Sequence, residues 1–290
     1  MTGLYPLVKR NVRLYFSDRV AVFFSLLGAL IAIFLILVFL RSSIVNSVTN
    51  SSDGLIDASL AGHLLHVWLI ASASVIASAT TGLGALREFV ADRETARWRD
   101  FLVTPLPRWT IAGGYLLAAT VVAILMTTVV YGLGTLFCWA TGAPLSLGDT
   151  LEAWGWLMLS ALGFTALMGF IVACLKTEAA YGGVSTIIGV TFGFLAGTYV
   201  TTGALPAGAA NVLNSLPFAQ ASALVRQPYT RQVIAALPEQ ARDPLSAQMG
   251  IQLTVGASPV TTPVVVAVLV AMAVVFSVAA WQIMTRTVRR

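Results

Sequence analysis

The sequence predicts an all-α integral membrane protein, a single transmembrane domain over residues 1–290 with six transmembrane helices. Three observations predict it. Hydrophobic residues make up 58% of the 290 residues, the mean hydropathy is +0.86, and charged residues make up only 10%. A soluble domain of this size could not bury so much apolar surface. The few charges also cluster between apolar stretches that are long enough to cross a bilayer.

Six apolar stretches are the predicted spans. A helix of about 20 residues is about 30 Å long, which is the thickness of the hydrocarbon core. Before the first span, residues 1–19 mix apolar side chains with Lys9, Arg10 and Arg13, which predicts an amphipathic helix at the membrane interface. The spans are expected at residues 20–40, 64–86, 111–137, 156–175, 181–202 and 264–284.

Two regions outside the spans are expected on the outer side. Residues 41–62 are rich in Ser, Asn and Asp and predict a loop. Residues 203–262 contain repeated prolines, yet parts of this region are apolar. That mixture predicts an external segment whose short helices re-enter the membrane before the last span.

The basic residues predict the topology. If the amino terminus is cytoplasmic, most Lys and Arg residues are cytoplasmic, and only Arg41, Arg226, Arg231 and Arg242 fall outside. This asymmetry follows the positive-inside rule. We therefore expect a multi-pass protein of the cell membrane with both termini in the cytoplasm. The distribution of the basic residues is explained by the membrane topology, so nucleic acid is not an expected partner.

The densest charge lies at residues 87–109, between the second and third predicted spans. Each charge would cost about 2.5–3.5 kcal/mol at the membrane centre, so this segment must lie in water or among headgroups. Apolar or small residues recur along it at helical spacing, which predicts a short amphipathic helix ended by prolines. These residues are Ala91, Thr95, Trp98, Phe101 and Leu102, followed by Pro105 and Pro107.

The fifth predicted span carries a stripe of small residues. Gly189, Gly193 and Gly197 recur at four-residue intervals. Such spacing allows close backbone contact between membrane helices, although it can also arise by chance in a glycine-rich protein. We expect the stripe to mediate helix packing between the first and fifth spans, within one chain or across two copies.

Several kinds of chemistry have no counterpart in the sequence. No charged residue lies well inside a predicted span, which argues against an ion-driven carrier. The phosphate-binding GxxxxGK[ST] loop is absent, as are the GxSxG and HExxH motifs, so no catalytic residue and no cofactor of this chain are predicted. His63 and His66 share one helix face, but without nearby Cys or carboxylate a packing role is favoured over a metal site.

Two stretches resemble the transmembrane subunit of type-2 ABC transporters, the ABC exporter permease family. They are LVKRNVRLYFSDRVAVFFSLLGALI at residues 7–31 and REFVADRETARWRDFLVTPLPRWTIAGGYLL at residues 87–117. Residues 213–227 are more weakly similar to the family segment after span five. In the second stretch, Asp92 and Glu94 stand where many members have a glycine-centred turn. Its family-like residues are Arg87 and Glu88, then Leu102, Thr104, Pro105, Arg108 and Gly113.

The resemblance implies a function and partners. Two permease copies, identical or related, would pair with two separate ATPase subunits that bind ATP and Mg²⁺. The charged segment would act as a coupling helix in a cleft of the ATPase, with aromatic anchors and orienting arginines. The alternative is that this helix only lies against membrane lipid. The implied coupling residues are Arg87, Glu88, Asp92, Arg93, Glu94, Arg97, Trp98, Arg99, Phe101 and Leu102.

Two other classes of function are compatible with six spans. One is a passive channel or carrier without an ATPase, and the other is a membrane-embedded enzyme, which the missing catalytic motifs disfavour. The second span is rich in hydroxyls, including Ser72, Ser74, Ser78, Thr80 and Thr81. An apolar interior with such hydroxyls and no fixed charge predicts an amphipathic substrate, such as a drug, a peptide or a lipid-like molecule.

Overall fold

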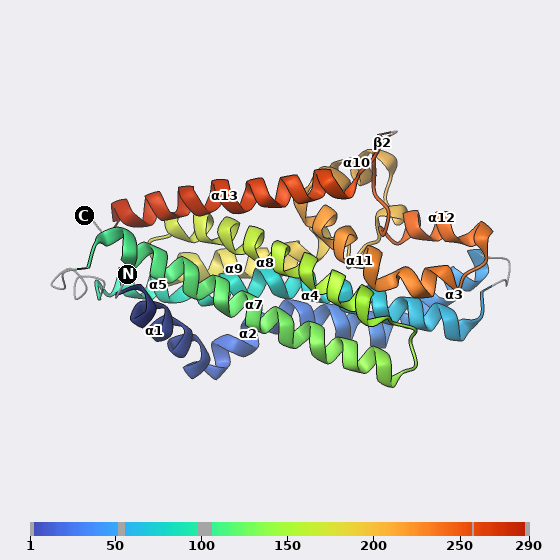
Figure 1. Cartoon of the computed structure of the whole chain (residues 1–290), viewed down its shortest axis with the longest axis horizontal. Helices are drawn as coiled ribbons and strands as arrows, with labels where there is room; N and C mark the ends of the chain where they lie inside the picture. Colours follow the sequence, from blue (N-terminus) through green and yellow to red (C-terminus); the bar gives the residue numbers. More distant parts are fainter. Residues whose placement is uncertain (1–2, 52–55, 98–105, 257, 288–290) are drawn as a thin grey trace.

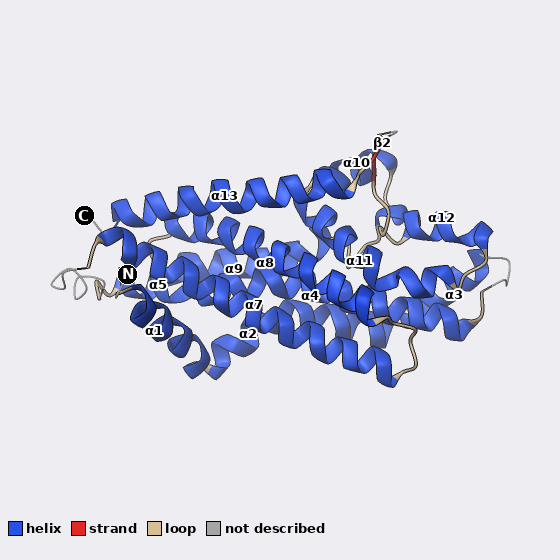
Figure 2. Ribbon diagram, in the orientation of Figure 1, coloured by secondary structure: helices blue, strands red, loops and turns tan. Residues whose placement is uncertain are grey.

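The computed structural model describes residues 3–51, 56–97, 106–256 and 258–287. Most of these residues lie in helices, and the strands β1 (Thr254–Val255) and β2 (Ser258–Pro259) form one short hairpin (Figure 2). The long helices run roughly parallel to one another in an elongated bundle (Figure 1). They are α2 (Arg19–Phe34), α4 (Ala58–Ala85), α7 (Arg108–Ala140), α8 (Leu147–Cys174), α9 (Glu178–Leu195) and α13 (Thr262–Thr287).

Shorter helices complete the two ends of the bundle. Helix α5, the start of α1 and the end of α13 lie together at one end, called the α5 end below (Figure 1). Helices α3 and α12 lie at the opposite end, called the far end. The shorter helices are α1 (Leu4–Ser17), α3 (Arg41–Ser51), α5 (Arg87–Glu94), α10 (Ala207–Ser215), α11 (Pro217–Ala235) and α12 (Glu239–Gln248).

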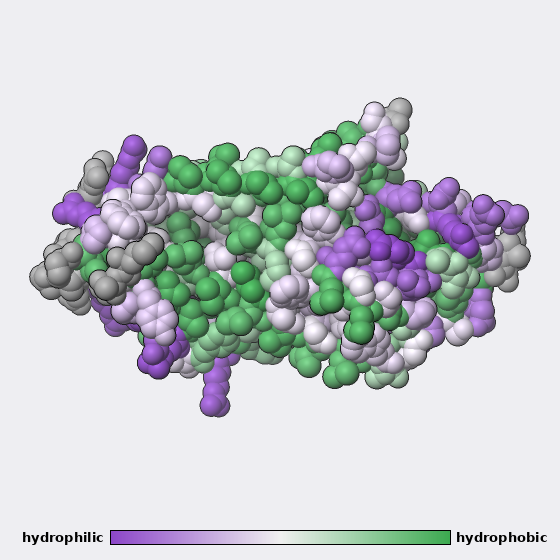
Figure 3. All heavy atoms as spheres, in the orientation of Figure 1, coloured by the Kyte–Doolittle hydropathy of each residue, from purple (hydrophilic) through white to green (hydrophobic). Residues whose placement is uncertain are grey.

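The predicted fold class is confirmed. Among the described residues, six helices are long and apolar enough to cross a membrane. On the face shown in Figure 3, apolar side chains cover much of the middle of the bundle, between more polar ends. Which end faces the cytoplasm stays a prediction from the positive-inside rule.

Helix α4 is the centre of the bundle, because it contacts α2, α7, α8 and α11. Its apolar window is 83% buried, against 22% for the window of the first span. Small residues make this possible, since Ala, Ser and Gly let neighbouring helices approach closely. The hydroxyls of α4 mostly bond to their own helix: Ser72 donates to the Trp68 carbonyl at 2.6 Å and Thr81 to the Ala77 carbonyl at 2.6 Å.

Two predicted boundaries were wrong. The predicted loop at residues 41–62 begins instead with helix α3, which continues α2 through a π-helical turn at Leu35–Leu40. The predicted fifth span, residues 181–202, ends as a helix at Leu195. Gly197 has a φ of +61°, a left-handed conformation that only glycine adopts readily, so the chain turns there.

The region before the last span folds into the bundle more deeply than expected. Helix α11 is 19 residues long and packs against α4 and α8. Pro217 stands at its first turn, where a missing N–H costs nothing. The buried face of α11 includes Ser222, Arg226 and Thr230, so this helix brings polar groups inside the bundle.

Candidate functional site

Helix α5 holds the ends of other helices through ionic side chains. Arg87, at its start, donates from Nη1 to Asp18 at 3.1 Å and from Nη2 to Glu178 at 3.4 Å. Asp18 caps the amino terminus of α2, and Glu178 begins α9. All three side chains are about 40% exposed. Exposed pairs of this kind contribute about 0–1 kcal/mol each, so they set geometry more than stability.

Asp92 is the buried centre of this end of the bundle. Its side chain is only 2% exposed and accepts a hydrogen bond from Arg10 of α1, at 3.0 Å. The hydroxyl of Tyr115 of α7 donates a second hydrogen bond to it at 2.6 Å. The ring of Tyr115 also makes an edge contact with Phe89 of α5. A buried carboxylate requires such partners, because an unpaired buried charge costs several kcal/mol.

Arg10 is the partly exposed cation that pairs with Asp92. Burial by itself would lower the pKa of the Arg10 guanidinium, but the hydrogen bond and the charge of Asp92 outweigh that effect and raise it. Arg10 therefore stays protonated at any physiological pH. Its side chain also donates to Asn11 at 2.9 Å, which fixes the guanidinium on the face of α1 that meets α5.

The last turn of α5 holds the connection between α8 and α9. Arg93 donates to the Ala173 carbonyl at 3.2 Å and to the Leu175 carbonyl at 2.6 Å, at the carboxyl end of α8. Glu94 accepts a hydrogen bond from the backbone N–H of Glu178 at 2.6 Å. These are the free backbone groups of helix ends, which favour a cation and an anion respectively.

Together, four side chains of α5 contact five other helices. We call this set the α5 node; it comprises Arg87, Asp92, Arg93 and Glu94, which contact α1, α2, α7, α8 and α9. A displacement of α5 would therefore change its contacts with all five of these helices.

The remaining predicted coupling residues fall into two groups. Glu88 lies in the first turn of α5, and Arg97 is exposed beyond its end. The amphipathic helix predicted in this segment is interrupted, since α5 stops at Glu94 and Ala96 has a φ of 57°, which is uncommon for alanine. Trp98, Arg99, Phe101 and Leu102 lie outside the described residues, so their predicted docking role stays a prediction.

A groove of about 1050 Å³ runs between α2, α4 and α9. Its mouth at the α5 end carries Asp18 and Arg87, and its walls are mainly apolar with scattered hydroxyls. Of the hydroxyl residues predicted to line the interior of the second span, Thr80 reaches this groove. Gly28, Gly189, Phe194 and Tyr199 are among the residues that line it.

The three glycines of the predicted stripe have different surroundings. A Cβ on Gly189 would meet nothing within 4 Å, whereas a Cβ on Gly193 would lie 2.2 Å from the ring of Tyr199. Gly197 lies beyond the helix, in the turn. Helices α2 and α9 approach at Gly28, where a Cβ would lie 3.4 Å from the Gly189 carbonyl oxygen. A dimer contact at this stripe stays a prediction.

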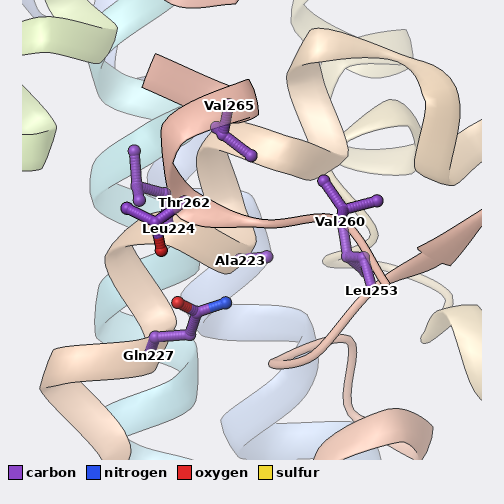
Figure 4. A pocket seen from close by; sticks show the side chains of 7 residues that line it. All are labelled: Ala223, Leu224, Gln227, Leu253, Val260, Thr262 and Val265. Carbon is purple, nitrogen blue, oxygen red and sulfur yellow. The ribbon is translucent and has the colours of Figure 1, made fainter. Parts of the chain in front are cut away.

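A second, much smaller cavity lies between α11 and the start of α13 (Figure 4). Its volume is about 10 Å³. That is close to the space one water molecule needs, so this cavity cannot hold a substrate. Gln227, at its edge, donates to the Ile251 carbonyl at 3.1 Å and ties α11 to the following loop.

The two histidines take part in packing. Nε2 of His63 lies 3.1 Å from the Thr141 carbonyl oxygen, and the ring of His66 makes an edge contact with Phe137. Among the residues that the structure describes, no group of three or more His, Cys, Asp or Glu is arranged to hold a metal ion.

Sequence reasoning did not identify the partners of the α5 node. Tyr115 was part of an unremarkable apolar span, and Asp18 and Glu178 were assigned only to segments that flank predicted spans. Tyr115 lies near the start of α7, and its polarity in an otherwise apolar stretch was the available signal. The topology assigns Arg226 to the outer side of the membrane, which stays a prediction, but its burial inside the bundle, with an exposed fraction of 1%, was not predicted.

The six-span bundle with its apolar middle defines a multi-pass α-helical membrane protein. The family model for ABC-2 type transporters matches residues 2–227. The chain therefore belongs to the ABC-2 type transporter family and is the membrane permease component of an ABC transporter, a family membership that implies an ATPase partner. Such permeases are transmembrane subunits and generally non-catalytic. No curated protein matches the chain.

Proposed function

We propose that this chain is the permease of an ATP-driven exporter, in which two permease copies work with two copies of a separate ATPase. The observation that carries the proposal is the α5 node. A partner can shift a conformational equilibrium only through contacts that differ between the two states. Helix α5 contacts five other helices by ionic hydrogen bonds, so an ATPase that moves α5 would move them as well.

The α5 node divides the predicted coupling segment into two roles. Asp92 and Arg93 face the bundle and would transmit movement, since their charged groups contact α1, α7 and α8. Arg97 is exposed, and Trp98, Arg99, Phe101 and Leu102 follow it in sequence. Exposed arginines beside large apolar residues are typical of an interface with another protein. We assign docking to residues 97–102.

The groove between α2, α4 and α9 supports a route for an amphipathic substrate. Its mouth is charged and its walls are mainly apolar. Helices α2 and α9 also expose most of their surface, with apolar windows only 22% and 17% buried. A second copy of the chain placed against these two helices would enclose the groove. The volume of about 1050 Å³ is large enough for a drug-sized or lipid-like molecule.

The first experiment is co-purification in detergent with the ATPase encoded nearest to this chain. Wild type is compared with the double variant Trp98→Ala, Phe101→Ala. The double variant should lose both the complex and stimulated ATP hydrolysis, because alanine removes the aromatic anchors. Failure of the wild type to bind any ATPase would overturn the proposal.

The controls separate docking from folding and test the substrate class. Trp109→Ala removes an exposed aromatic residue that lies beyond residues 97–102, and it should leave the complex intact. For substrate, vesicles containing the complex are loaded with either a tail-labelled phospholipid or the hydrophilic dye carboxyfluorescein. ATP-driven movement of the dye alone would contradict an amphipathic substrate.

A further inference from the structure

Arg226 of α11 is a fully buried charge with neutral hydrogen-bond partners. Its Nε donates to the Ser72 hydroxyl of α4 at 2.8 Å. Nη2 donates to the carbonyl oxygens of Ala196 and Gly197, both at 3.1 Å. Nη1 donates to the Gly250 carbonyl at 3.2 Å. We call these contacts the Arg226 clamp; they join α4, the end of α9 and the loop after α12.

The clamp has unusual electrostatics. Among the described residues, no carboxylate forms an ion pair with Arg226, and the face of Trp68 lies 4.7 Å from its Cζ atom. Burying an unpaired charge costs several kcal/mol, which carbonyl dipoles and an aromatic face offset in part. Neutral partners also hold a cation less tightly than a carboxylate does, so the clamp can be released and rehydrated more readily than a buried ion pair.

Tyr199 follows the clamp by two residues in the sequence and lies in the groove. Beyond Gly197 the chain folds back, so that the backbone N–H of Tyr199 donates to the Gly193 carbonyl at 3.2 Å. The Tyr199 ring lies against Gly193, and its hydroxyl donates to the Gly28 carbonyl of α2 at 3.4 Å. Tyr199 therefore crosses from one wall of the groove to the other. It also makes an edge contact with the ring of Phe194.

We propose that Arg226 is a positioning residue that holds Tyr199 across the groove, and that loss of its bonds to Ala196 and Gly197 opens the groove toward the far end. This inference rests on the proposed transport function, because it assigns the groove a gate. The geometry supports it in two respects. The Ala196 and Gly197 carbonyls that Arg226 binds lie three and two residues before Tyr199, and the positive φ of Gly197 places a turn between α9 and Tyr199.

The reporter for the test is Thr198→Cys, in a chain that carries Cys138→Ala and Cys174→Ala. Thr198 lies between the clamp and Tyr199, is 2% exposed, and its hydroxyl has no hydrogen-bond partner among the described residues. Cysteine is close to threonine in size, so the exchange leaves Arg226 and Tyr199 in place. The rate of reaction of this introduced cysteine with a hydrophilic methanethiosulfonate measures how often the turn opens.

Arg226→Lys and Ser72→Ala are then added separately to the reporter chain. Lysine keeps the charge but lacks the planar fork that reaches Ala196, Gly197 and Gly250 together, so more than one bond is lost. The introduced cysteine should therefore react more than about tenfold faster, since about tenfold is the factor expected from losing a single hydrogen bond to a charged group. Ser72→Ala removes a single bond and should give a smaller increase. If Arg226→Lys does not fold, Ser72→Ala alone tests whether the clamp controls the opening of the turn. Unchanged rates in both variants would overturn the proposal.

The matched control is Arg231→Gln on the same helix. Arg231 is half-exposed and forms ion pairs with Asp149 and Glu152 of α8, away from the clamp. Its loss should leave the labelling rate of the reporter chain unchanged, and an equal increase would show general loosening of α11 instead of a gate. These measurements need no ATPase, so they can fail or succeed independently of the proposed function. With the ATPase present, ATP should accelerate labelling of the reporter chain that keeps Arg226.

Discussion

Tyr115 donates a 2.6 Å hydrogen bond to Asp92, and this contact joins the long span α7 to the short polar helix α5. Because Asp92 is buried and also holds Arg10, one carboxylate connects three helices. Of the α5 contacts, this one is best protected from solvent and so contributes most to the position of α5.

We expect Asp92→Asn to weaken coupling without abolishing ATPase binding. The amide keeps the shape of the side chain but removes the charge that pairs with Arg10, a loss of about 1–3 kcal/mol. ATP hydrolysis stimulated by the permease should fall severalfold, while co-purification stays near wild type. Asp243→Asn, at an exposed position of α12, is the control and should change neither. Complete loss of ATPase binding in Asp92→Asn would contradict the assignment of Asp92 to the bundle.

Arg97 and Arg93 should respond differently to loss of charge. Arg97 is exposed, so Arg97→Glu should weaken ATPase binding in a salt-dependent manner. Arg93 donates to two carbonyls at the end of α8, so Arg93→Gln should lower the thermal unfolding temperature by a few degrees and affect binding less. Binding can be measured by biolayer interferometry and unfolding by differential scanning fluorimetry. The reverse pattern would contradict the division into docking and transmitting residues.

Gly189→Leu tests the predicted contact between two copies. A Cβ there would meet nothing within 4 Å in one chain, so we expect the single subunit to stay folded. If a second copy packs on this face, leucine should reduce the dimer fraction seen by mass photometry. Gly182→Leu is the matched control, because it lies on the same helix and is also open. If both variants reduce the dimer fraction equally, or if neither reduces it, the result counts against an interface at Gly189.

Gly193→Ala tests the role of Tyr199 inside one chain. The new Cβ would lie 2.2 Å from the Tyr199 ring, so the ring must move. Overpacking of this kind typically costs about 1–3 kcal/mol. We expect a lower unfolding temperature and faster labelling of Thr198→Cys, and the second variant Gly193→Ala, Tyr199→Ala should restore stability. Failure of that rescue would show that Gly193 packs against something other than Tyr199.

Much of the fold could be predicted because hydrophobicity is a local property. Apolar stretches of membrane length located the six spans, and clustered charges located the segment that contains α5. The boundaries were less accurate. The helix predicted to run to residue 202 stops at Leu195 because a glycine turn, and not a loss of hydrophobicity, ends it.

The site could be predicted only in part. The charged composition of residues 87–97 was visible, but the direction in which each charge points was not. Asp92 and Arg97 are equally polar in sequence, yet one is buried by α1 and α7 and the other is exposed. The burial of Arg226 could not be predicted, because no sequence pattern reveals carbonyl groups that come from distant segments.

The sequence by itself determined the class of the protein, its membrane spans and its family, because these depend on composition and on short motifs. Only the tertiary structure decided which charges face inward. It brought Asp92 to Arg10 and Tyr115, and it surrounded Arg226 with carbonyls from the end of α9 and the loop after α12. The physical reason is that a buried charge is stable only where groups from different helices converge on it, and helix packing sets that convergence.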